Sequence, residues 1–198
     1  MPRALLGSVQ TSRNDVAGAT PDFLLEDELL DVRRVAPDAI IARAVAGARS
    51  AMWRGVHAVL ATLNARTRFR FTGLYRVETS ILRNVALFDR ENPMLHGAGQ
   101  CSALRDTYCN IVAANALSLA VGDATTDARL IGHPARDSVL SYVGVPVRDR
   151  AGKVAGTLCH WDTRPRLAPA GELVVLERVS ELLTSFIGTA ATRIGDQR

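Results

Sequence analysis

The sequence predicts an α+β fold, in which a central antiparallel sheet carries helices on both sides and the terminal helices pack together. Three observations predict it: an apolar helical repeat near the start, short segments with strand composition in the middle, and a second helical repeat near the end. The chain has 198 residues, of which 47% are apolar. That length suits one core with helical extensions and is too short for two large domains.

The first helical repeat covers residues 37–63, where apolar side chains recur at spacings of three and four. We expect one long helix that lies against the sheet, and its stripe also suits a dimer seam. A shorter helix is predicted over residues 21–35, after an arm without periodicity. The domain plan is therefore an arm with a short helix (1–36), one domain with flanking helices (37–193) and a tail (194–198).

The middle of the chain alternates strands, turns and one helix. Strands are predicted over 68–78, 80–89 and 118–122, and a helix over 104–114 that Ser102 caps. In the turn that follows 118–122, Asp123 or Thr126 can cap free backbone donors. A final amphipathic helix is marked by Leu173, Leu176, Val179, Leu183 and Ile187.

The most informative segment is a predicted hairpin. Residues 142–147 read Tyr-Val-Gly-Val-Pro-Val, residues 150–153 supply a turn, and residues 154–162 read Val-Ala-Gly-Thr-Leu-Cys-His-Trp-Asp. Glycine inside a strand costs stability unless close approach requires it. We therefore expect Gly144 and Gly156 to face the covered side of the sheet.

This hairpin resembles the C-terminal hairpin of GAF domains, which has an aromatic-x-Gly-x-Pro strand, a Gly-containing turn and a Gly-Thr-Leu-Cys strand followed by Asp. The similarity extends over roughly residues 53–189, about two-thirds of the chain, with further marks at 107–110, 119–123 and 127–129. It implies a GAF/PAS-like fold of the bacterial stand-alone sensory subtype. In that family a ligand lies between the sheet and the helices and loops that cover it.

By this resemblance, eight residues would line the pocket: Phe71, Tyr75, Tyr108, Cys109, Asp123, Ser141, Tyr142 and Thr157. Four of them also have a structural interpretation. Tyr108 and Cys109 suit a core, Asp123 suits a helix cap, and Tyr142 needs a hydrogen-bond partner for its phenol when buried. Asp162, at a strand end, is expected to bond the local backbone.

Composition narrows the function classes. The net charge is +4, but the arginines are scattered without a dense basic tract, so we expect no nucleic-acid partner. No apolar run is long enough for a membrane helix or a signal-peptide core, so we expect a cytoplasmic protein without a membrane partner. The three cysteines and four histidines lack metal-site spacing, so reduced thiols and no metal or other cofactor are expected.

The resemblance suggests three sharper functions. Photoreceptor GAF domains attach bilins through a Cys-His pair on a helix, whereas Cys159-His160 lies in a predicted strand. The Asn-Lys-x-x-x-Phe motif of cyclic-nucleotide-binding phosphodiesterase GAF domains is absent. Free methionine sulfoxide reductases are GAF proteins with a nucleophilic and a resolving Cys, for which Cys101 and Cys109 are the candidates here, although that family's Gly-Val-Cys-Gly context is missing.

The function that fits best is a non-catalytic sensory or regulatory module. It would bind a small molecule or a signalling protein in trans and form a homodimer through its terminal helices. In that case Cys109 and Cys159 should be buried while Cys101 is accessible. The alternative is a thiol-dependent enzyme like the free methionine sulfoxide reductases, using Cys101 and Cys109.

Overall fold

The computed structural model describes residues 37–95 and 97–187. Its six-stranded sheet has the order β3-β2-β1-β6-β5-β4, with every neighbouring pair antiparallel. The strands are β1 (Phe71–Glu78), β2 (Ile81–Asp89), β3 (Cys101–Ala103), β4 (Leu119–Val121), β5 (Ser141–Arg148) and β6 (Val154–Asp162). The helices are α2 (Asp38–Ala51), α3 (Val56–Asn64), α4 (Tyr108–Asn115), α5 (Glu172–Leu182) and α6 (Thr184–Ile187). The predicted α+β class is confirmed.

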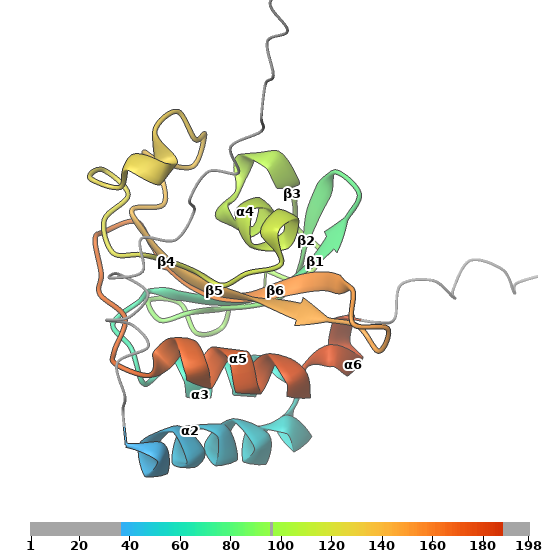
Figure 1. Ribbon diagram of the computed structural model, residues 1–198. Coiled ribbons are helices and arrows are strands. Elements are labelled where there is room, and N and C mark those ends of the chain that lie inside the picture. The colour runs from blue at the N-terminus through green and yellow to red at the C-terminus, as the bar shows by residue number, and fades with distance from the viewer. Residues whose placement is uncertain (1–36, 96, 188–198) are drawn as a thin grey trace, which may run out of the picture.

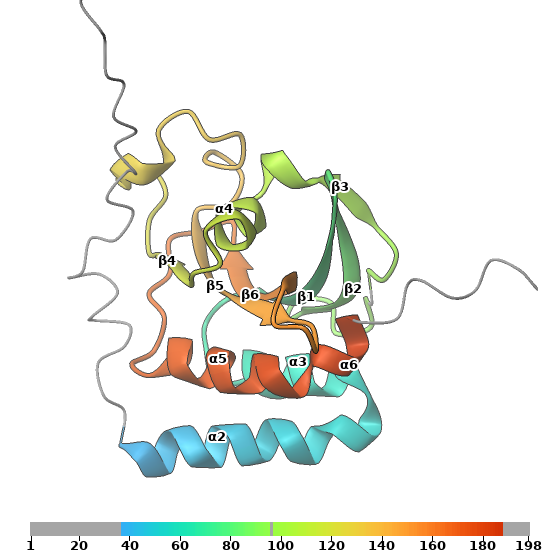
Figure 2. The same cartoon turned by 45° about the vertical axis from the view of Figure 1, so that its right-hand side comes forward.

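Helices cover both faces of this sheet. Figure 1 shows α3 and α5 against one face, here called the helical face, with α2 beyond them as a further layer. On the opposite face, here called the lid face, α4 lies over the centre of the sheet, and Figure 2 shows the same layers after a 45° turn. Every helix in the described part of the chain is too short or too polar to span a bilayer.

Strand alternation assigns side chains to the two faces. On β6, Leu158 belongs to the core against α3 and α5, whereas Cys159 belongs to the core beneath α4. Gly144 pairs with Cys159 and faces the lid side, while a side chain at Gly156 would meet Ile187 on the helical side. The expectation that both glycines face one covered side was therefore wrong. Gly144 lies on the same face as its partner Cys159, and Gly156 is separated from Cys159 by an odd number of residues along β6, which places it on the opposite face.

The predicted long helix over 37–63 is interrupted. Gly55 has φ 94° and ψ 170°, a conformation that ends the first segment and lets α3 begin at Val56. A short 3-10 helix over Met52–Arg54 leads into this break. The prediction of helix on both sides of Gly55 is confirmed. The prediction of one continuous helix is wrong, because this glycine changes the direction of the chain.

The break gives a stability prediction. We expect Gly55→Ala to lower the free energy of unfolding by about 1 to 2 kcal/mol, since a side chain disfavours positive φ. No atom lies within 4 Å of a Cβ built there, so the loss would come from the backbone alone. Gly47→Ala within α2 is the matched control, and there a Cβ makes an ordinary contact of 3.6 Å with Thr62. Urea unfolding should show about 0.5 to 1 kcal/mol of stabilisation for Gly47→Ala; the same sign for both variants would contradict the assignment.

Both apolar stripes that motivated the homodimer are used within the chain. Ile41, Ala48, Val59 and Leu63 are buried in one core together with the stripe of α5 and with Ile187 of α6. A homodimer stays a prediction, and the buried residues of these stripes are not available to form its interface.

Other predicted boundaries shift by a few residues. The helix expected from residue 104 begins at Tyr108, with Thr107 in extended conformation at its N-cap and a 3-10 turn over Leu104–Asp106 before it. Ser102 lies in β3, so its predicted capping role was wrong. The predicted helix over 21–35, the arm and the tail lie outside the described residues, and the domain boundaries stay predictions.

Candidate functional site

A cavity of about 210 Å³ lies between the lid face and α4. Its walls are aromatic: Tyr75 from β1, Tyr108 from α4, Tyr142 from β5 and Trp161 from β6. Leu82, Ala135 and Val139 add apolar surface. Such a concave, mostly apolar space with a few convergent polar groups is the usual form of a small-molecule site.

Hydrogen bonds fix the aromatic walls. The Trp161 indole donates to the Tyr75 hydroxyl at 3.1 Å, and the Tyr108 hydroxyl donates to the Val139 carbonyl at 3.1 Å. The rings of Tyr108 and Tyr142 meet edge to face, 5.6 Å apart. Burial raises the pKa of Tyr75 and Tyr142 well above the ordinary value and that of Tyr108 to about 12, so all three phenols are neutral near pH 7.

Two glycines create the room for these rings. Gly73 on β1 and Gly144 on β5 both pair with Cys159, one on each side. A Cβ at Gly73 would overlap the Tyr75 ring, and one at Gly144 would overlap the Tyr142 ring. The tyrosines therefore lie over the bare backbone of the sheet and flank Cys159 between them.

Two thiols lie at the bottom of the cavity, Cys109 from α4 and Cys159 from β6. The Cys109 sulfur lies 3.5 Å from the Tyr142 hydroxyl oxygen. The neighbouring thiol of Cys159 is the main cause that lowers the pKa of Cys109 despite its burial. Burial is the main cause of a strongly raised pKa at Cys159.

The cavity opens to solvent at its polar end. Ser102, Asp106 and Ser138 line it and are exposed. Asp106 is the one carboxylate among the described lining residues, and no Arg or Lys is among them. The site therefore offers hydroxyls and aromatic faces, with at most one negative charge at the mouth.

The structure brings together part of the predicted site. Tyr75, Tyr108, Cys109 and Tyr142 line the cavity, and the Thr157 hydroxyl lies beside Cys109 beneath it.

The other three predicted residues lie outside the cavity. Phe71 stacks on Trp161 with ring centroids 3.8 Å apart. Ser141 donates to the Arg164 carbonyl at 2.7 Å, and Asp123 accepts from the backbone N–H and the hydroxyl of Thr125. Asp123 is thus a turn cap, as its alternative interpretation predicted.

Sequence reasoning missed Cys159 and Trp161 as lining residues. The period of two in β6 places both on the same face as Thr157, so strand alternation could have found them. Ala135, Ser138 and Val139 come from a loop whose sequence carries no periodic signal, and Ser102 and Asp106 come from the segment before α4.

A second polar cluster lies on the helical face. Asn64 donates to the Thr72 hydroxyl at 2.9 Å. The Thr72 hydroxyl therefore uses its own proton to donate to Nδ1 of His160, at 2.6 Å. Nε2 of His160 then donates to Glu172 at 3.3 Å, and Arg66 donates to the other carboxylate oxygen at 3.2 Å. We call these five residues the buried relay.

The order Thr72, His160, Glu172 resembles a nucleophile, base and orienting acid, but all three are 0% exposed. A substrate therefore cannot reach them, and the buried relay joins α3, β1, β6 and α5 instead. Cys159 and His160 are also divided between opposite faces of the sheet, so the adjacent Cys-His pair does not act as one site.

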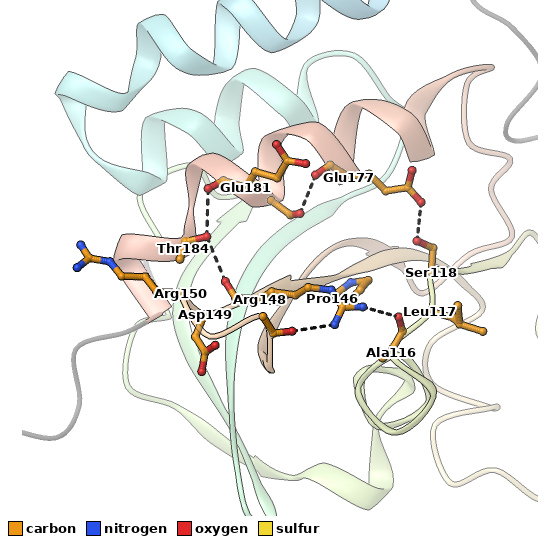
Figure 3. A pocket seen from close by; sticks show the side chains of 12 residues that line it. Ala116, Leu117, Ser118, Pro146, Arg148, Asp149, Arg150, Glu177, Glu181 and Thr184 are labelled. Atoms are coloured by element: carbon orange, nitrogen blue, oxygen red, sulfur yellow. Dashed lines mark hydrogen bonds between the residues drawn. The ribbon is translucent and has the colours of Figure 1, made fainter.

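Figure 3 shows a different hollow, of about 560 Å³, between α5, the β5–β6 turn and residues 116–118. Several of its polar side chains bond one another or the backbone: Ser118 donates to Glu177 at 2.8 Å, Arg148 to the Ala116 carbonyl at 3.1 Å, and Thr184 to the Arg148 carbonyl at 3.1 Å. Although this groove is larger, its described lining is largely polar, of mixed charge and without aromatic walls, so the cavity beneath α4 is the stronger candidate.

The predicted pair Cys101 and Cys109 is not assembled. Cys101 is exposed on the edge strand β3 and lines a hollow with Ser80 and Ile81, whereas Cys109 and Cys159 are buried in the cavity beneath α4. The predicted exposure of the three thiols is therefore confirmed. Within residues 37–95 and 97–187, no group of three or more His, Cys, Asp or Glu is placed to hold a metal ion.

Comparison of the sequence with protein-family models and with curated proteins gives no match. Comparison of the structure gives several. The GAF domain of an Acinetobacter phosphoenolpyruvate-protein phosphotransferase matches with TM-score 0.57 and 15% identity, over 77% of this chain and 94% of that one. The chromophore-binding domain of Stigmatella aurantiaca phytochrome P1 matches with TM-score 0.60 and 13% identity, over 80% and 63%.

A type II free methionine-R-sulfoxide reductase from Thermoplasma acidophilum also matches, with TM-score 0.51 and 19% identity, over 73% of this chain and 94% of that one. These proteins differ in function, so what they share with this chain is the fold.

Proposed function

We propose that this chain, which has the fold of GAF domains, is a regulatory module whose small-molecule ligand occupies the cavity beneath α4. The observation that carries the proposal is the cavity itself, because four aromatic walls and two thiols converge there from one helix and three central strands. The cavity has a volume of about 210 Å³ and is lined by more apolar than polar side chains. Its mouth at Ser102, Asp106 and Ser138 gives a ligand a way in.

The lining indicates a small, uncharged aromatic ligand. The volume is below the roughly 300 to 1,000 Å³ of sites for drug-sized molecules. Because the described lining residues include Asp106 and no Arg or Lys, a phosphate group would meet no cation and one carboxylate. This supports an aromatic molecule that stacks on Tyr108 or Trp161 and argues against a cyclic nucleotide.

The proposed output is a partner protein in trans that contacts α4. This helix of eight residues presents Tyr108 and Cys109 to the cavity and Val112 to the core beneath it. Filling or emptying the cavity changes what α4 packs on, so a partner bound to its outer surface can detect the ligand. A reductase that uses Cys101 and Cys109 is less well supported, since these thiols line different hollows.

Trp161 provides the test. The chain has two tryptophans, and the other, Trp53, is 84% exposed, so Trp53→Phe leaves one reporter in the cavity wall. We expect a phenol to quench Trp161 fluorescence or shift its emission saturably and to raise the melting temperature, whereas binding of indole, itself fluorescent, is followed by the melting temperature alone. Ser138→Trp, placed at the mouth, should remove the rise in melting temperature.

Ser50→Trp, an exposed substitution on α2, is the matched control and should leave thermal stabilisation by the ligand intact. Binding of cyclic AMP or cyclic GMP in place of the uncharged aromatics would contradict the proposed ligand class. Equal binding by the Ser138→Trp and wild-type proteins would contradict the proposed site.

A further inference from the structure

Cys109 and Cys159 come from different elements and line the same cavity, together with Tyr142. The Cys109 sulfur lies 3.5 Å from the Tyr142 hydroxyl oxygen, and both thiols act on the pKa of that hydroxyl. Gly73 and Gly144, which pair with Cys159 on either side, present no side chain between it and α4. The register of the sheet therefore leaves Cys159 facing Cys109.

The surroundings of Cys109 favour its thiolate. It is the second residue of α4, where free backbone N–H groups and the helix dipole stabilise negative charge. The Tyr142 hydroxyl lies 3.5 Å from its sulfur, and the thiol of Cys159 is the main cause that lowers its pKa. The Thr157 hydroxyl, wholly buried, has no hydrogen-bond partner and is therefore free to donate to a thiolate at Cys109.

A nucleophilic thiol must form a thiolate more readily than the thiol that resolves it. Cys109 lies at the N-terminal end of α4, where the helix dipole favours a thiolate, whereas Cys159 is 0% exposed within β6, where burial raises its pKa. A small oxidant can approach through the exposed end of the cavity at Ser102 and Ser138.

We propose that Cys109 and Cys159 form a redox pair, which a hydroperoxide converts into an intramolecular disulfide. The Cys109 thiolate attacks one oxygen of the peroxide, an S–O bond forms and the O–O bond breaks. The other oxygen takes the electron pair of the broken bond and leaves as hydroxide or alkoxide. The Cys159 sulfur then attacks the sulfenic sulfur, an S–S bond forms, and the S–O oxygen leaves with a proton as water. In total, two thiols and one hydroperoxide give one disulfide, one alcohol or water, and one water.

The disulfide would join α4 to the centre of the sheet at the bottom of the cavity. An S–S bond of about 2.05 Å brings the sulfurs closer than any hydrogen-bonded pair of thiols. Oxidation therefore draws α4 toward β6 and should change the affinity for the ligand. This consequence rests on the proposed function, whereas the disulfide itself does not.

Hydrogen peroxide on the purified, fully reduced chain is the test. The wild type has three thiols, of which we expect one, Cys101, to remain after treatment with a slight excess of peroxide and denaturation. Peptide mapping without reductant should show Cys109 linked to Cys159, with the loss of two hydrogen atoms. Cys101→Ser, which removes the exposed thiol, is the matched control and should lose both remaining thiols at an unchanged rate.

Cys159→Ser should stop at a Cys109 sulfenic acid that dimedone traps, and Cys109→Ser should leave Cys159 reduced. Thermal melts of both variants establish that they are folded. The proposal fails if the exposed Cys101 is oxidised first while Cys109 stays a free thiol, or if Cys109→Ser does not protect Cys159. A disulfide that forms in a protein without ligand affinity would leave this inference intact and overturn only the proposed function.

Discussion

Replacing Glu172 with alanine is expected to lower the free energy of unfolding by about 3 to 5 kcal/mol, the range for removing one partner of a buried ion pair. Glu172 is 0% exposed and accepts from His160 at 3.3 Å and from Arg66 at 3.2 Å. Its loss leaves the fully buried His160 donor without an acceptor. It also removes a carboxylate from the first residue of α5, where the helix dipole favours negative charge.

Glu181→Ala is the matched control, because Glu181 lies on the same helix and is exposed. We expect this control to change stability by less than about 0.5 kcal/mol. Urea denaturation of both variants measures the difference. A Glu172→Ala protein within about 1 kcal/mol of the wild type would show that the buried relay does not hold α5 to the sheet.

The second large effect is expected from valine at the two hairpin glycines. At Gly156 an added side chain would collide with the backbone carbonyl of Tyr75 and with Ile187, and a carbonyl cannot rotate away. We expect Gly156→Val to cost about 3 kcal/mol or more, the upper part of the range for overpacking. The cavity lies on the opposite face, so any protein that remains folded should bind the ligand normally.

Gly144→Val should behave differently, since the nearest atoms belong to the outer end of the Tyr142 side chain. That ring can move, at a cost of about 1 to 3 kcal/mol, and because Tyr142 is a wall of the cavity its displacement changes the shape of the site. Binding of the aromatic probe should therefore be lost while the protein remains folded. Loss of binding in Gly156→Val with retention in Gly144→Val would reverse the assignment of the two faces.

Five of the six strands and the helical segments could be predicted from the sequence, because strand composition, glycine-containing turns and helical stripes agree with the tertiary pattern there. The short edge strand β3 (Cys101–Ala103) was not predicted. The error at Gly55 arose because an apolar repeat continues across a residue that breaks the helix, and periodicity does not report backbone direction.

The candidate site was predicted in part, for a physical reason. Tyr75, Tyr108, Cys109 and Tyr142 lie on regular elements whose inward faces can be inferred. Phe71 was misassigned because it stacks on Trp161 instead of lining the cavity. The pairing of Cys109 with Cys159 depends on how α4 crosses the sheet, and sequence spacing contains no measure of that crossing.

A map of amide chemical shifts, recorded while indole is added to the ¹⁵N-labelled, reduced chain, tests the proposed binding site most directly. Binding in the cavity beneath α4 predicts saturable changes concentrated at the start of α4, at Tyr142 and at Trp161, with little change around Arg148 and Thr184. Changes concentrated in that polar groove, or none at saturating indole, would contradict the claim that the cavity beneath α4 is the binding site.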